Sequence, residues 1–160
     1  MIFKSYLLEK NIDQALNCKI FLFYGENEGL KKEFKEKLKK KIKNKIIIFF
    51  QEEIIKNRDL LSNEVLNRSL FDSEKTIFIE QTDDKILKII EKFENIENVR
   101  IFLFASVLNK KSKLRDFFDK SKIFGVTACY VDNELTIKMI IQEKLRDLKG
   151  ITPTIIKNKI

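Results

Sequence analysis

The sequence predicts an α/β fold built on a mainly parallel sheet of five strands, and two observations lead to it. Short runs rich in Ile, Val and Phe recur along the chain, and segments with helical periodicity separate them. The runs are continuously apolar rather than alternating, which is typical of strands that helices cover on both faces. Repeated alternation of strand and helix favours parallel strands joined by right-handed crossovers.

The five predicted strands share this apolar continuity, the last of them more weakly than the others. They cover residues 19–24, 45–50, 75–80, 99–105 and 126–131. The first predicted helix follows the first strand, because apolar residues there recur every four positions and lysines fill the rest of the segment. These stripe residues are Leu30, Phe34, Leu38 and Ile42. A second helix is predicted over residues 57–67.

Two further helices are predicted from short apolar stripes with polar cap residues before them. Ile86, Ile89, Ile90 and Phe93 form the stripe of the third helix. Thr82 and Asp83 are its candidate caps, because short polar side chains accept hydrogen bonds from the free amides of a first helical turn. Leu114, Phe117 and Phe118 form the stripe of the fourth helix, and Ser112 lies near its start.

The pattern changes after the fifth strand. Residues 133–149 have the periodicity of one long helix, and Gly150 is a suitable residue to end it. Thr152 and Pro153 then resemble the start of another helix, which has barely begun where the sequence ends at Ile160. We therefore expect one domain over residues 1–131, followed over residues 132–160 by the beginning of a helical second domain, and we expect the chain to be a fragment.

Composition excludes much of enzyme chemistry. The 160 residues contain no histidine, which removes imidazole bases and histidine-ligated metal sites. The two cysteines, Cys18 and Cys129, are far apart in sequence, so a cysteine-rich metal cluster is excluded. We expect no catalytic residues, no cofactor and no metal. The amino terminus does not resemble a signal peptide, and no apolar run has membrane-spanning length, so a cytoplasmic location without membrane contact is expected.

The net charge of +8 leaves two explanations open. Lysine and arginine together number 32, against 24 aspartates and glutamates. A basic domain favours nucleic acid or acidic partners. The alternative is a genome of low GC content, whose codons raise Lys, Ile, Asn and Phe together.

The loop after the first predicted strand, residues 24–32, stands where a phosphate-binding loop would lie. Its two glycines, Gly25 and Gly29, are one residue too close for the P-loop spacing, and the Lys-Ser/Thr pair does not follow the second. Glu26 and Glu28 would repel a triphosphate. The strand that ends near Glu80 also lacks the acidic pair of a working ATPase. These residues predict a turn into a helix rather than an ATP site.

Two other segments are candidate contact sites. Leu70 and Phe71 form an apolar pair among polar residues in a helix-to-strand connection, which suits docking into a partner's pocket. The pattern alone favours the alternative that the pair packs on its own sheet. Lys110, Lys111 and Lys113 form a basic cluster that suits phosphate or an acidic partner, or is a solvated surface of a lysine-rich protein.

Three of these segments together resemble the delta subunit of the bacterial DNA polymerase III clamp loader. They are residues 20–27 leading into a helix, Ser69-Leu70-Phe71 ahead of a strand, and residues 108–114. Residues 134–151 also resemble the start of that family's helical second domain. The resemblance extends over the whole chain in consistent order.

The resemblance implies an AAA+-like first domain that binds no nucleotide, then a helical domain and a collar domain. It implies binding to the sliding clamp (beta) to hold one ring interface open. The implied clamp-binding residues are Ser69, Leu70 and Phe71, of which Leu70 and Phe71 enter a hydrophobic pocket on the clamp. This favours the docking interpretation of the pair. Implied partners are the gamma/tau and delta-prime subunits and, through the assembly, DNA. The assembly has DNA-directed DNA polymerase activity. A divergent P-loop nucleotide-binding protein and a basic nucleic-acid-binding module remain the alternatives.

Overall fold

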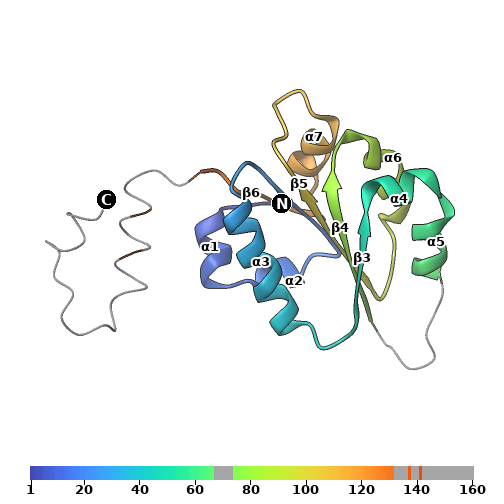
Figure 1. The fold of residues 1–160 in the computed structure, drawn as a ribbon, viewed down its shortest axis with the longest axis horizontal. Helices are drawn as coiled ribbons and strands as arrows, with labels where there is room; N and C mark the ends of the chain where they lie inside the picture. The colour runs from blue at the N-terminus through green and yellow to red at the C-terminus, as the bar shows by residue number, and fades with distance from the viewer. Residues whose placement is uncertain (67–73, 132–136, 138–140, 142–160) are drawn as a thin grey trace, which may run out of the picture. The chain divides into compact units, whose positions relative to one another are not determined.

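A computed structural model describes residues 1–66, 74–131, 137 and 141 of the chain. The chain divides into two compact units, Met1–Cys129 and Tyr130–Ile160. The first unit holds the sheet and its flanking helices, which are labelled in Figure 1. Of the second unit, Tyr130, Val131, Ile137 and Ile141 are described, and the last two are helical.

The first unit is built on a parallel sheet of strands in the order β1-β6-β2-β5-β4-β3. The strands are β1 (Ile2–Phe3), β2 (Ile20–Tyr24), β3 (Ile46–Phe50), β4 (Lys75–Thr82), β5 (Val99–Ala105) and β6 (Gly125–Ala128). The α/β fold class with parallel strands is therefore confirmed. The expected count of five is wrong, because β1 adds a sixth strand at the edge beside β6.

Helices cover both faces of this sheet, so the domain has three layers (Figure 1). One face carries α1 (Ser5–Lys10), α2 (Asp13–Leu16) and α3 (Glu28–Lys41). The other carries α4 (Gln51–Lys56), α5 (Asp59–Leu66), α6 (Leu87–Ile90) and α7 (Lys113–Lys120). Short 3₁₀ turns, η1 (Asp84–Ile86) and η2 (Glu91–Phe93), flank α6.

The two faces of the sheet have different side chains, because neighbouring residues of a strand point to opposite faces. The face under α1, α2 and α3 is aromatic, with buried Phe21, Phe23, Phe78, Phe102 and Phe104. Their rings lie against one another, and those of Phe23 and Phe104 stack with centroids 5.2 Å apart. The opposite face is aliphatic, with buried Ile20, Leu22, Ile77, Ile79, Ile101 and Leu103. Burial on both faces explains why the strands are continuously apolar.

Several predicted boundaries are corrected. The helix expected over residues 57–67 is α5, which begins at Asp59. Helix α4 was not predicted; it ends where Asn57 is extended (φ −125°, ψ 91°). The strand expected over residues 126–131 ends at Ala128. Strand β4 runs past Glu80 to Thr82, with a register shift around Gln81, whose φ of 55° is left-handed.

Two of the three candidate caps are confirmed. The carboxylate of Asp83 accepts a hydrogen bond from the Lys85 amide, and the hydroxyl of Ser112 accepts one from the Arg115 amide. Thr82 does not cap a helix. It is the last residue of β4 and is buried, so its hydroxyl lies in the core rather than at a helix start.

Candidate functional site

The carboxyl ends of β2, β5 and β6 meet at one edge of the sheet, where ligands of open α/β sheets usually bind. The loop from Gly25 to Asn27 connects β2 to α3 at this edge. Two of its amides are already bonded to residues that follow neighbouring strands: Gly25 N donates to Ser106 O at 2.9 Å, and Asn27 N donates to Cys129 O at 3.0 Å. The side chain of Asn27 caps α3 by accepting from Leu30 N at 3.0 Å.

Gly25 has a backbone conformation that only glycine adopts readily. Its φ is +129°, and a Cβ at this position would lie 2.1 Å from Cys129 O. The loop backbone therefore packs directly on the end of β6. No room for a phosphate remains between these two backbone segments.

The lysine nearest to the P-loop position points inward. Lys31 is buried, and its ammonium donates to Ala105 O and to a carboxylate oxygen of Glu28, both at 2.7 Å. Glu80, at the end of β4, is bound by Lys35 at 2.6 Å. The Lys35 ammonium also lies 4.5 Å from the centroid of the Phe104 ring.

This geometry argues against a nucleotide site at the loop. Phosphate binding at a helix N-terminus needs free amides and a cation that reaches the β- and γ-phosphates. Here the loop amides bond to strand ends and Lys31 bonds to Ala105. Glu26 is exposed at the same place and adds negative charge, whereas Glu28 is paired with Lys31.

The two thiols are inert groups of the core. Burial raises the pKa of Cys129 to about 12; the charge of Lys31 lowers this pKa, and the charges of Glu28 and Glu9 raise it further, all by smaller amounts. Burial also raises the pKa of Cys18, although the amino-terminal charge lowers it slightly. Both thiols therefore stay protonated at neutral pH and are poor nucleophiles.

The candidate clamp-contact residues Ser69, Leu70 and Phe71 lie outside the residues that the structure describes. The described residues that follow them are held by ion pairs. Lys75 forms an ion pair with Glu64 of α5 at 2.9 Å, and Glu74 forms one with Arg100 at 2.9 Å. On the other side, Leu66 ends α5 with 74% of its surface exposed.

The candidate basic residues Lys110, Lys111 and Lys113 lie together and are exposed, at the turn into α7. Asp84 of η1 holds this turn in place. Its carboxylate accepts from the Ser112 hydroxyl at 2.5 Å and from the amides of Leu114 at 3.0 Å and Lys113 at 3.1 Å. The cluster is therefore mixed in charge rather than purely basic.

The hydrogen bonds to Asp84 also change its acidity. Partial burial raises the pKa of this carboxyl. The hydrogen bonds from Ser112, Leu114 and Lys113 and the charge of Lys113 outweigh burial and lower the pKa below its ordinary value. Sequence patterns did not identify this role of Asp84, because its partners lie about 30 positions away.

Two further findings concern metal binding and membrane spanning in the described part of the chain. It contains no group of three or more Cys, Asp or Glu side chains placed to hold a metal ion. Among the described helices, none is long and apolar enough to cross a membrane.

Comparison with known proteins identifies the fold. No protein-family profile and no curated protein sequence matches the chain. Among solved structures, the DNA clamp loader delta protein (YqeN) of Bacillus subtilis matches with a TM-score of 0.68 over 89% of this chain, at 11% sequence identity. The chain has the fold of a clamp-loader delta protein. The resemblance noted from the sequence is thus confirmed at the level of fold.

The match covers 47% of the Bacillus protein, so the present chain spans about half the length of that delta protein. RIF2 of Saccharomyces cerevisiae also matches, with a TM-score of 0.55 and 10% identity, over 97% of this chain and 65% of RIF2. At such low identities, both likenesses concern the fold alone.

Proposed function

We propose that this chain is the amino-terminal part of a clamp-loader delta subunit that binds the sliding clamp and holds one ring interface open. The likeness in fold to the Bacillus delta protein carries the proposal. The order of Ser69-Leu70-Phe71 and the basic turn along the sequence supports it. The proposal places the protein in the cytoplasm, in an assembly with gamma/tau and delta-prime subunits that contacts DNA.

The proposed mechanism is mechanical rather than chemical. Leu70 and Phe71 bury apolar surface in a pocket of the clamp, and anchors of this kind contribute about 2 kcal/mol or more each to binding. They open the ring only if they bind the open form more tightly than the closed form, since equal affinity shifts no equilibrium. ATP hydrolysis is left to partner subunits, in keeping with the occupied loop amides and the inward Lys31.

Binding of the full chain to its cognate sliding clamp tests the proposal, with surface plasmon resonance as the measurement. We expect L70A/F71A to abolish binding. The matched control is I48A/F50A, because Ile48 and Phe50 of β3 are also apolar and are 49% and 48% exposed. The control should keep wild-type affinity. If wild-type protein does not bind, or if both variants bind equally well, the proposal is wrong.

A divergent P-loop nucleotide-binding protein is the second class of function considered. Calorimetric titration with magnesium and ATP distinguishes it from the first. Saturable, magnesium-dependent binding would favour the nucleotide-binding class, whereas the occupied loop amides lead us to expect none.

A further inference from the structure

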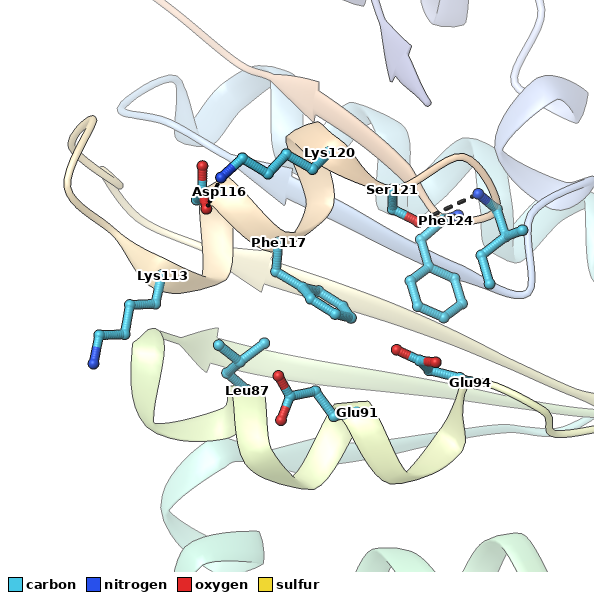
Figure 2. Close-up of a pocket in the computed structure, with 10 residues that line it drawn as sticks. Leu87, Glu91, Glu94, Lys113, Asp116, Phe117, Lys120, Ser121 and Phe124 are labelled. Carbon is cyan, nitrogen blue, oxygen red and sulfur yellow. Dashed lines mark hydrogen bonds and ion pairs between the residues drawn. The ribbon is translucent and has the colours of Figure 1, made fainter.

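The helices on the aliphatic face of the sheet enclose an open groove that the proposed function does not use. It lies between the α6–η2 segment and α7 and has a volume of about 480 Å³ (Figure 2). This volume is within the range of about 300–1,000 Å³ that is usual for ligand sites. A groove between two helices is also the geometry in which amphipathic helices of partner proteins bind.

The floor of the groove is apolar and packs on the core. Phe117 points from α7 toward Leu87 on the opposite wall (Figure 2). The Phe117 ring lies 5.9 Å from that of Phe124 and 5.6 Å from that of Phe118, and these two phenylalanines are buried in the core. Ile123 lies at the rim with 57% of its surface exposed. An apolar side chain that enters the groove would therefore contact an aromatic surface that packs on buried rings.

The wall formed by α6 and η2 carries unneutralised negative charge. Glu91 and Glu94 are exposed, line the groove, and form no ion pair with any described residue. They are three residues apart on a helical turn, where like charges repel. On the α7 side, Asp116 is neutralised by Lys120 at 2.7 Å. Lys113 of α7 also lines the groove, so three carboxylates face two lysines and the lining has a net charge of −1. A negative lining beside an apolar floor is unexpected in a chain with a net charge of +8.

We propose that this groove binds a helical segment of a partner protein that carries apolar side chains on one face and lysine or arginine beside them. The apolar side chains would pack on Leu87, Phe117 and Ile123. The basic side chains would pair with Glu91 and Glu94, whose charge also disfavours phosphate groups of nucleic acids and anionic lipids. The inference does not rest on the clamp proposal, since the proposed clamp anchors Leu70 and Phe71 do not line the groove; the two surfaces share only Lys113.

The probe is a synthetic helical peptide of about 15 residues, the length at which an isolated helix becomes stable. It has leucines four residues apart on one face and lysines beside them. Binding to the full chain is followed by chemical shifts of backbone amides. We expect saturable shifts confined to residues 87–94 and 113–124.

Charge variants test whether the peptide binds in the groove. The E91K/E94K substitutions should lower the affinity for the lysine peptide about tenfold. A peptide with glutamate in place of lysine should bind this variant more tightly than it binds the wild type. The matched control is E26K/E97K, which makes the same change in net charge at exposed glutamates outside the groove. The control should keep wild-type affinity. Ile123→Ser, at the exposed rim, should also weaken binding.

Four outcomes would overturn the proposal. They are no saturable shifts, shifts elsewhere on the protein, equal weakening in E91K/E94K and E26K/E97K, or a failure of the charge-exchanged peptide to prefer E91K/E94K. Sedimentation of the chain without the peptide tests whether a second copy of the chain occupies the groove. A dimer that E91K/E94K dissociates would show that the groove binds the chain itself rather than a partner protein.

Discussion

The ammonium group of Lys31 donates a hydrogen bond to the carbonyl oxygen of Ala105, with 2.7 Å between the two atoms. This bond joins the first turn of α3 to the end of β5 across the edge where nucleotides bind in related architectures. Glu28 binds the same ammonium at 2.7 Å, so the charge is paired although Lys31 is buried. A lysine at this loop therefore has a structural role.

Replacing Lys31 with Met should destabilise the fold. The substitution leaves the Ala105 carbonyl without its donor, and an unsatisfied buried acceptor costs about 1–3 kcal/mol. Urea denaturation should show this as a lower free energy of unfolding. The matched control is Lys32→Met, because Lys32 is exposed next to it, and its effect should stay within about 0.5 kcal/mol. Equal effects of the two substitutions would contradict the structural role of Lys31.

Gly25→Ala and Gly29→Ala should differ greatly in their effect on stability. A Cβ on Gly25 would lie 2.1 Å from the backbone oxygen of Cys129, at a φ that disfavours any side chain. We expect a loss of about 3 kcal/mol or more, or failure to fold. At Gly29, in the first turn of α3, the nearest atom is 3.5 Å away, and alanine should be neutral or stabilise by up to about 1 kcal/mol. Thermal unfolding measures both. A mild effect at Gly25 would show that the loop does not pack on β6 in this way.

How far the sequence predicts this fold depends on the length of each element. Apolar runs of five or more residues, such as Ile20–Tyr24 and Val99–Ala105, were predicted almost to the residue, because burial on both faces leaves a continuous signal. Strand β1 has two residues and α2 has four, which is too short for any periodicity. Contacts with the rest of the domain determine that these two elements form, more than their own sequences do. Strand β1 pairs with β6, and α2 packs on the core.

The site was predictable only where spacing along the chain carried the information. The missing P-loop spacing around Gly25 and Gly29 pointed to an altered loop. The contacts that fill the loop, Lys31 to Ala105 and Asn27 to Cys129, join residues 74 or more positions apart, and no sequence pattern identifies such pairs. The contact role of Leu70 and Phe71 stays a prediction, because these residues lie outside the described part of the chain.

Threonine-to-valine substitutions at two buried positions should have opposite effects. The Thr82 hydroxyl oxygen is buried and has no hydrogen-bond partner among the described residues, so Thr82→Val should be neutral or stabilise by about 1 kcal/mol. Thr127 is also buried, but its hydroxyl donates to Phe3 O at 2.9 Å and ties β6 to β1. Thr127→Val should cost about 1–3 kcal/mol. Urea denaturation compares them, and destabilisation by Thr82→Val would mean that its hydroxyl has a partner.

Asp84 should make stability depend on pH in the acid range. Its pKa is lower in the folded than in the unfolded chain, so folding favours the ionised form. The resulting stabilisation is present above the unfolded pKa of about 3.9 and is lost as the pH falls through the lower folded value. Both carboxylate oxygens of Asp84 accept hydrogen bonds, and asparagine would replace one of them with a donor. At pH 7, Asp84→Asn should therefore cost about 1 kcal/mol, the net value of one hydrogen bond. The difference between the two proteins should shrink as the pH falls below about 4. A difference that stays constant with pH would contradict this role for the carboxylate charge.

Salt dependence should distinguish an apolar clamp contact from an electrostatic one. Lys110, Lys111 and Lys113 are exposed at a turn that Asp84 caps, so their field is partly cancelled nearby and salt screens the remainder over about 8 Å at physiological ionic strength. Apolar burial by Leu70 and Phe71 does not depend on such attraction. Clamp affinity should therefore change little between about 0.15 M and about 0.5 M salt.

Replacing the three lysines with serine should slow association with the clamp only a few-fold, because exposed charges at a rim act mainly on the association rate. L70A/F71A should instead abolish binding at both salt concentrations, since removing two central apolar anchors removes most of the binding energy. Association and dissociation rates from surface plasmon resonance separate the two effects, and circular dichroism checks that each variant is folded. Suppose that the lysine variant loses binding while L70A/F71A keeps it. The clamp would then be bound through the basic turn before α7, and Leu70 and Phe71 would have no part in the contact.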